Sequence, residues 1–211
     1  MRLTVLGATG RTGVHVLDRA LTAGHEVTAA VRNPAAVAKQ HPGLRVVEAD
    51  VCSVESMADA IRGADAVCTV LGSTAPREPT TLYSASMAAL VEAMKQTGVR
   101  RMVAVTAIPA EPDELKTFID RHIVHRLLHV FFGGGYDDMV RMEQLLQRSD
   151  TDWTVLRPPR LTDAKPHDRY RTAIDARLAH AGKIPRADLA LAVLNTVTDS
   201  SLIGHGVTVA S

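Results

Sequence analysis

Short runs of hydrophobic residues alternate along the chain with longer segments whose apolar positions recur at helical spacing. Short apolar runs bounded by glycine, proline or asparagine are typical of strands buried in a sheet, and the longer spacing is typical of helices. The expected strands are Leu3–Leu6, Glu26–Val31, Leu44–Glu48, Ala66–Leu71, Arg101–Thr106, Trp153–Leu156 and Val207–Val209. The expected helices are Arg11–Ala23, Val54–Ile61, Thr81–Gln96, Glu114–Val130, Asp137–Arg148 and Asp188–Asn195. Because glycine disfavours helix interiors, the run Gly133–Gly135 is expected to separate two of these helices.

The order of these elements predicts the fold. Strands that alternate with helices imply parallel strands joined by right-handed helical crossovers. We therefore expect an α/β protein, a Rossmann doubly wound parallel sheet with helices on both faces, formed by residues 1–211 as one domain. The polar, charge-rich stretch 162–183 is expected to pass over the carboxyl edge of the sheet as a small substrate cap or lid. Ligands bind at that edge in open α/β sheets.

Composition and charge narrow the function. Of 211 residues, 46% are hydrophobic but only 3% are aromatic, so Ala, Val, Leu and Ile must fill the core. The 24 basic and 23 acidic residues are interspersed, which argues against nucleic-acid binding. The chain shows neither an apolar run long enough for a membrane span nor a signal-peptide pattern, so we expect no membrane association and a cytoplasmic location. Cys52 and Cys68 are expected to be buried, reduced thiols.

A glycine-rich turn directly follows the first strand and opens the first helix. At this spacing Gly7 permits a tight turn, Gly10 lets the backbone approach a pyrophosphate, and Gly13 lets the helix pack against the strand. The positive end of the helix would then face the phosphates. The residues of this turn expected to contact a dinucleotide are Gly7, Thr9, Gly10, Arg11, Thr12 and Gly13. The alternative is a Rossmann fold that no longer binds a cofactor.

The end of the second strand indicates which dinucleotide is bound. NAD sites usually place an Asp or Glu there for the ribose hydroxyl, whereas this chain has Arg32. Its guanidinium suits a 2′-phosphate, and Arg11 could reach the same group, so NADP(H) is preferred over NAD(H). The alternative is that Arg32 is a solvated loop residue. Further cofactor contacts are expected from Asp50 and Val51, beside the adenine, and from Leu71 and Gly72, beside the middle of the cofactor.

Several segments resemble the atypical short-chain dehydrogenase/reductase superfamily, in its NmrA-like and biliverdin-IXβ/flavin-reductase-like branch. They are the turn Gly7–Gly13, Val31–Pro34, Asp50-Val51, Gly98–Thr106, Asp138–Glu143, Trp153–Pro158 and Ile184–Ala190. The last three are the more specific, because many unrelated proteins share the turn. The resemblance implies that Thr106 lies beside the nicotinamide and that Pro158 and Pro159 line its pocket. Family members bind NADP(H); several reduce flavins, quinones or tetrapyrroles, and others only sense the cofactor and regulate a partner.

The chain departs from these relatives where acid–base chemistry would be expected. Most short-chain dehydrogenases use a Tyr with a Lys four residues later, but Met87, Val140 and Ile174 occupy that position after the three tyrosines. Flavin-reductase-like relatives often carry a Ser after the Thr of the fifth strand and a His after the double proline, where this chain has Ala107 and Arg160. These differences argue against carbonyl chemistry by the Tyr/Lys pair and weaken the case for tetrapyrrole reduction.

We therefore expect an NADPH-dependent oxidoreductase that transfers hydride to a flat conjugated small-molecule acceptor such as a flavin or quinone. The candidate catalytic residues are Thr106, Tyr136 and Arg160, each of which could instead have a structural role. The chain is expected to act as a monomer or homodimer without a metal, although His122, His125 and His129 share a helical face. Alternatives are a non-catalytic NADP(H)-sensing regulator and, disfavoured by the missing Tyr/Lys pair and short chain, a relative of sugar-nucleotide epimerases.

Overall fold

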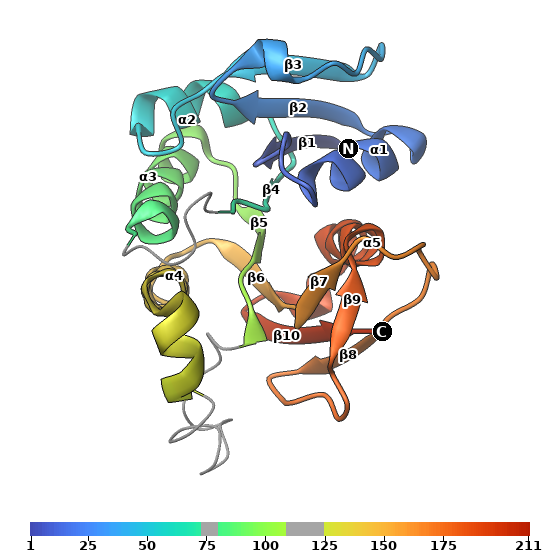
Figure 1. Ribbon diagram of the computed structural model, residues 1–211. Coiled ribbons are helices and arrows are strands. Elements are labelled where there is room, and N and C mark those ends of the chain that lie inside the picture. The colour runs from blue at the N-terminus through green and yellow to red at the C-terminus, as the bar shows by residue number, and fades with distance from the viewer. Residues whose placement is uncertain (73–79, 109–124) are drawn as a thin grey trace.

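A β-sheet of eight strands runs through the centre of the molecule, with helices on both faces (Figure 1). The computed structural model describes residues 1–72, 80–108 and 125–211. The strands of the sheet are β1 (Arg2–Leu6), β2 (Glu26–Val31), β3 (Leu44–Glu48), β4 (Ala66–Thr69), β5 (Arg101–Val105), β6 (Asp152–Arg157), β8 (Arg171–Ile174) and β10 (His205–Ala210). Their order is β3-β2-β1-β4-β5-β6-β10-β8, and every neighbouring pair is parallel except β10 with β8. The predicted α/β class with a mostly parallel, Rossmann-type sheet is confirmed.

Two hydrophobic layers sandwich the sheet. The helices are α1 (Gly13–Thr22), α2 (Val54–Ile61), α3 (Leu82–Thr97), α4 (His125–Gln147) and α5 (Arg186–Thr198). Helices α1 and α5 pack on one face, and α2, α3 and the end of α4 pack on the other. Successive side chains of a strand point to opposite faces, so Leu3 and Val5 of β1 join the first layer and Leu6 joins the second. Within the described ranges, no helix is both long and apolar enough to span a bilayer.

Helix α4 continues through the three glycines that were expected to interrupt it. The structure shows one helix over His125–Gln147, so the predicted break at Gly133–Gly135 is wrong. A glycine lowers helix stability by only about 1 kcal/mol, which packing can override. Such packing is present, because Met142 and Leu146 near the end of α4 are buried in the layer formed with α2 and α3. Most of the predicted helix Glu114–Val130 lies outside the described residues.

The stretch 162–183 differs in part from the expected excursion over the carboxyl edge. Within it, β8 joins the main sheet as its antiparallel edge strand, with Arg171 opposite Ala210 and Ile174 opposite Val207. Two short parallel strands, β7 (Arg160–Thr162) and β9 (Lys183–Pro185), form a second sheet at its two ends. Strand β8 is largely exposed. An edge strand of this kind buries no apolar face, so its sequence lacks the alternation that predicts strands.

Two fully buried carboxylates join helices of this half of the molecule to the start of another helix and to a loop. Asp138 of α4 accepts hydrogen bonds from the backbone N–H of Tyr83 (2.7 Å) and of Ser84 (3.3 Å), at the start of α3. Asp188 of α5 accepts from the backbone N–H groups of His167 and Asp168, each at 3.0 Å from its nearer oxygen. These bonds give partners to N–H groups in the first turn of α3 and in the loop before β8, and they fix the position of both.

The two cysteines have different environments. Cys68 of β4 is buried, as expected, whereas Cys52 is exposed in the loop after β3, so its predicted burial is wrong. Both are free thiols. The loop position of Cys52 explains its exposure, since strand β3 has ended before it. Burial raises the pKa of the Cys68 thiol to about 12.

Thiol labelling tests this difference. At pH 8 the native protein is expected to react with one equivalent of a thiol reagent at Cys52 much faster than with a second, because Cys68 is inaccessible; partial burial and Asp50 also raise the pKa of Cys52, so accessibility decides the difference. In denaturant, both thiols should react. A Cys52→Ser variant serves as the control and should show no rapid phase. Two rapid equivalents in the native protein would contradict the burial of Cys68.

Candidate cofactor-binding site

The turn between β1 and α1 closes only because its glycines lack side chains. Gly7 has a φ of +80°, and the backbone N–H of Gly10 donates to the Gly7 carbonyl at 2.9 Å. A Cβ on Gly7 would lie 2.7 Å from the carbonyl oxygen of Val70 at the end of β4, and one on Gly13 would lie 2.0 Å from the Gly7 carbonyl oxygen. The first turn of α1 is thereby brought against the end of β1, with its positive end directed to the carboxyl edge of the sheet.

A cleft of about 740 Å³ opens at this turn. It lies over the carboxyl ends of β1, β2 and β4, where open α/β sheets bind ligands. Nine of the residues predicted to contact a cofactor line it: Gly7, Thr9, Gly10, Arg11, Thr12, Arg32, Val51, Leu71 and Gly72. Sequence reasoning did not assign the other lining residues to the site: Ala30, Val31, Val70, Thr80, Leu82, Leu161 and Arg186.

The charged residues of the cleft all have the same sign. Arg11 comes from the glycine turn, Arg32 from the residue after β2, and Arg186 from the first residue of α5. Among the described residues that line the cleft there is no Asp or Glu. Arg186 lies in the segment Ile184–Ala190 that carried the family resemblance, which was the signal available for it. A lining of this kind attracts anionic groups such as phosphates.

Four residues predicted for cofactor binding lie outside this lining. Gly13 lies where α1 packs against the glycine turn, close to the Gly7 carbonyl. Asp50 shapes the loop before α2, where its Oδ1 accepts from the Cys52 N–H at 2.9 Å. Pro158 is buried, and its carbonyl accepts from the Ile108 N–H at 3.1 Å. Thr106, which follows β5, is also buried, so its contact with a cofactor stays a prediction, as does that of Pro158.

Thr106 belongs to a buried polar cluster. Its hydroxyl donates to Glu143 Oε1 of α4 at 2.7 Å. Arg157, the last residue of β6, binds the same carboxylate through Nε at 3.2 Å to each oxygen and through Nη2 at 2.6 Å to Oε2. The Glu143 and Arg157 side chains are only 5% and 4% exposed. A Cβ on Gly206 would lie 2.3 Å from the Arg157 guanidinium, so a side chain there would displace the guanidinium from its present position.

This cluster fixes what the Thr106 hydroxyl can do. Because the paired Glu143 is a carboxylate, it can only accept hydrogen bonds, and Thr106 must give it its one proton. A hydroxyl oxygen has two lone pairs, so Thr106 can also accept a hydrogen bond from a group placed against it. Thr106 is therefore suited to bind an N–H donor and is unsuited to protonate a substrate.

The other two candidate catalytic residues are not brought to the cleft. Tyr136, on α4, is half-buried, and burial, followed by the effect of Tyr83, raises the pKa of its phenol. It is therefore a neutral hydroxyl near neutral pH. Arg160 is exposed at the start of β7. Neither is among the described residues that line the cleft, and their catalytic roles stay predictions. Of the histidine face, His122 lies outside the described residues.

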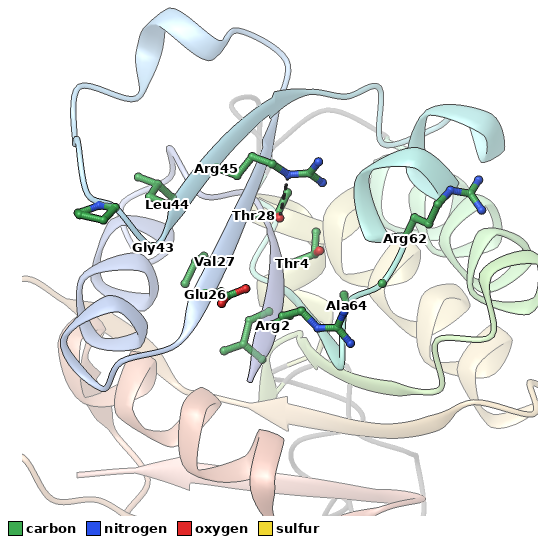
Figure 2. A pocket seen from close by; sticks show the side chains of 13 residues that line it. Arg2, Thr4, Glu26, Val27, Thr28, Gly43, Leu44, Arg45, Arg62 and Ala64 are labelled. Carbon is green, nitrogen blue, oxygen red and sulfur yellow. Dashed lines mark hydrogen bonds between the residues drawn. The ribbon is translucent and has the colours of Figure 1, made fainter.

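A second hollow, of about 540 Å³, lies at the opposite edge of the sheet (Figure 2). It is formed by the amino ends of β1, β2 and β3 and by the loop that follows α2. Its arginines already have partners: Arg2 pairs with Asp65 at 2.9 Å, Arg62 with Asp59 at 3.4 Å, and Arg45 Nε donates to Thr28 Oγ1 at 3.4 Å. Polar residues such as Thr28 suit this solvent-facing part of the sheet.

Strand β1, the glycine turn and α1 form a nucleotide-binding unit, and the cleft lies where such units hold a dinucleotide. The fold and the cleft thus define the class of protein, an NAD(P)-binding Rossmann-type domain. Residues 7–200 match the family model described as NAD(P)H-binding. Because the match spans most of its 211 residues, the chain belongs to this NAD(P)H-binding family.

Similarity to known proteins supports the same class of protein. The chain is 28% identical over 206 residues to the protein YwnB of Bacillus subtilis (strain 168), which covers 92% of this chain and 91% of YwnB. ChuY, an anaerobillin reductase from Escherichia coli O157:H7, superposes with a TM-score of 0.81 at 20% identity, covering 100% of this chain and 97% of ChuY.

A short-chain dehydrogenase/reductase from Veillonella parvula DSM 2008, solved in complex with NADP, superposes with a TM-score of 0.73 at 17% identity, covering 100% of this chain and 94% of that chain. These identities show a shared fold. With the family match, they confirm the NAD(P)-binding Rossmann-type domain that the resemblance implies.

Substitution of Gly13 tests the construction of the turn. Gly13→Ala is expected to lower the free energy of unfolding by about 2–4 kcal/mol, because its Cβ would meet backbone atoms that cannot move independently. The measurement is urea unfolding followed by circular dichroism. Gly182→Ala is the control, since a Cβ there meets no atom within 4 Å. Equal stability of the Gly13 variant and the wild type would contradict the close approach of α1 to the turn.

Proposed function

We propose that the protein is an NADPH-dependent oxidoreductase that transfers hydride to a flat conjugated small-molecule acceptor, such as a flavin or quinone, as a monomer or homodimer. The observation that carries the proposal is the cleft at the glycine turn, lined by three arginines and, among its described residues, by no carboxylate. Membership of the NAD(P)H-binding family supports a nicotinamide cofactor. ChuY, a protein of the same fold, is a reductase.

The preference for NADPH rests on Arg32. This exposed residue lines the cleft directly after β2, at the position where NAD-binding domains usually carry an acidic residue for the ribose hydroxyls. A carboxylate there would repel a 2′-phosphate, whereas a guanidinium can bind it through two hydrogen bonds. The NADP complex of the Veillonella protein shows that the shared fold accommodates this cofactor.

The chemistry assigned to the protein is positioning rather than proton transfer. When bound, the nicotinamide cofactor supplies the hydride. The turn and α1 would hold its phosphates, and Thr106, at the carboxyl end of β5, would accept a hydrogen bond from its carboxamide N–H. Since the Thr106 proton is held by Glu143, this residue cannot protonate the acceptor. That favours acceptors that stabilise the added charge themselves and take a proton from water, as flavins and quinones do.

The same features also support a second candidate, an NADP(H)-binding regulator that changes its affinity for a partner with the redox state of the cofactor. It requires the cleft but no acid or base, which agrees with the missing Tyr/Lys pair. The two candidates share the binding step and differ only in turnover.

Arg32→Ala is expected to weaken NADPH binding by a factor of roughly ten or more, because a charge-assisted contact to the 2′-phosphate is lost. NADH binding should change little. Isothermal titration calorimetry with both cofactors measures the difference. Arg45→Ala is the matched control, since Arg45 is an exposed arginine in the hollow at the opposite edge. An equal loss for NADH and NADPH would show that Arg32 does not bind the 2′-phosphate.

Turnover distinguishes the enzyme from the regulator. NADPH oxidation is followed at steady state with FMN, riboflavin and a panel of quinones, and saturation with one acceptor is expected. Thr106→Val, which keeps the shape but removes the oxygen, should lower kcat/KM, and Thr106→Ser should retain most of it. Tight NADPH binding without turnover of any acceptor would support the regulator instead.

A further inference from the structure

One carboxylate outside the lining of the cleft bridges two of its three arginines. Asp163, the residue after β7, accepts from Arg186 Nη1 through its Oδ1 at 2.7 Å and from Arg11 Nη2 through its Oδ2. Two guanidiniums that share one carboxylate must lie close to each other. Because like charges repel, an anion between them stabilises such a pair.

Arg186 is the less accessible member of this pair. Its side chain is 14% exposed, compared with 70% for Arg11 and 56% for Asp163. A cation that is largely removed from water requires a counter-ion, so an anion is needed beside Arg186 whether or not a ligand is present. In this structure Asp163 meets that need. Within the described chain, the exposed Asp163 is the ion-pair partner of both arginines.

The location of the pair indicates which ligand could replace Asp163. Arg11 lies between Gly10 and Gly13, in the turn that precedes the positive end of α1, and that end of a helix binds phosphate groups. Arg186 reaches the same place from α5, which packs beside α1. Arginine binds a phosphate in the same bidentate manner as a carboxylate. Arg32, by contrast, lies after β2 and shares no ion pair with Asp163 among the described contacts.

We infer that Arg11 and Arg186 form a clamp for the pyrophosphate of the cofactor, and that Asp163 occupies this clamp until the pyrophosphate replaces it. The inference rests on the proposed function, since it requires a dinucleotide in the cleft. It adds Arg186 to the binding residues and makes Asp163 an internal competitor that lowers affinity for the cofactor.

The chain around Asp163 allows the exchange without unfolding. Asp163 directly follows β7, and the next fixed point is at His167 and Asp168, whose N–H groups are held by the buried Asp188. Asp168 also pairs with Arg19 of α1. Release of Asp163 from the two arginines therefore breaks two partly exposed ion pairs and leaves these anchors in place. The Arg11–Asp163 pair is exposed and contributes little to stability, and Arg186 would exchange one anionic partner for another, so a dianionic ligand can displace Asp163.

The test is the effect of Asp163→Asn on cofactor affinity, measured by isothermal titration calorimetry with NADPH and with NADH. The variant removes the competing charge, so the Kd should fall roughly three- to tenfold. The factor should be the same for both cofactors, because they share the pyrophosphate. Arg186→Gln should raise both Kd values, again by similar factors. Thermal unfolding confirms that each variant is folded.

Asp168→Asn is the matched control, because it removes an aspartate from the same segment whose partner, Arg19, lies outside the cleft. Its Kd values should equal those of the wild type. If the wild type binds the cofactors and Asp163→Asn binds them equally well or more weakly, the proposed clamp is wrong. The proposed function is not affected by that result. A gain in affinity for NADPH alone also contradicts the clamp, because it would show that Asp163 competes with the 2′-phosphate and not with the pyrophosphate. If the wild type binds neither cofactor, the proposed function itself fails.

Discussion

The packing of α1 against the end of β1 is the constraint on which the rest of this structure depends. At Gly13 and Gly7 the backbone comes so close to its neighbours that even a methyl group has no room. The close packing places the start of α1 beside the point where the strand order reverses, between β1 and β4. Loops diverge on the two sides of that point, which leaves a cleft, and the helix end supplies partial positive charge at its floor.

Buried carboxylates organise the half of the molecule that follows β4. Asp138, Glu143 and Asp188 are each removed from water, and each receives several hydrogen bonds that offset the cost of burial. They join, respectively, α4 to the start of α3, α4 to the ends of β5 and β6, and α5 to the loop before β8. The family-like segments Asp138–Glu143 and Ile184–Ala190 therefore contain residues whose clearest role is to hold the carboxyl edge of the sheet together.

At the carboxyl edge of the sheet, the buried carboxylates hold the structure together, and the arginines line the cleft. The structural carboxylates are buried away from the cleft, so the described lining keeps an excess of guanidinium groups. Asp163 lies between these two sets, because it is exposed enough to move and still close enough to neutralise Arg11 and Arg186. A cation-rich cleft of this kind suits a ligand with several phosphates.

The sequence by itself determined the features that arise from neighbouring residues. The strand–turn–helix unit follows from the spacing of Gly7, Gly10 and Gly13, and the α/β class follows from the alternation of apolar runs with helical patterns. The position of Arg32 beside the cleft follows from its place at the end of a predicted strand. These are local effects of chain geometry, so a periodic pattern is enough to reveal them.

Only the tertiary structure decided what depends on contacts between distant segments. Helix α4 runs on through Gly133–Gly135, and pairing with β10 makes an edge strand of a polar stretch. Arg11 and Asp163 are 152 positions apart, and Thr106 meets a glutamate 37 positions away. No local pattern encodes such pairings, because they arise when strands and helices bring remote side chains to the same edge of the sheet.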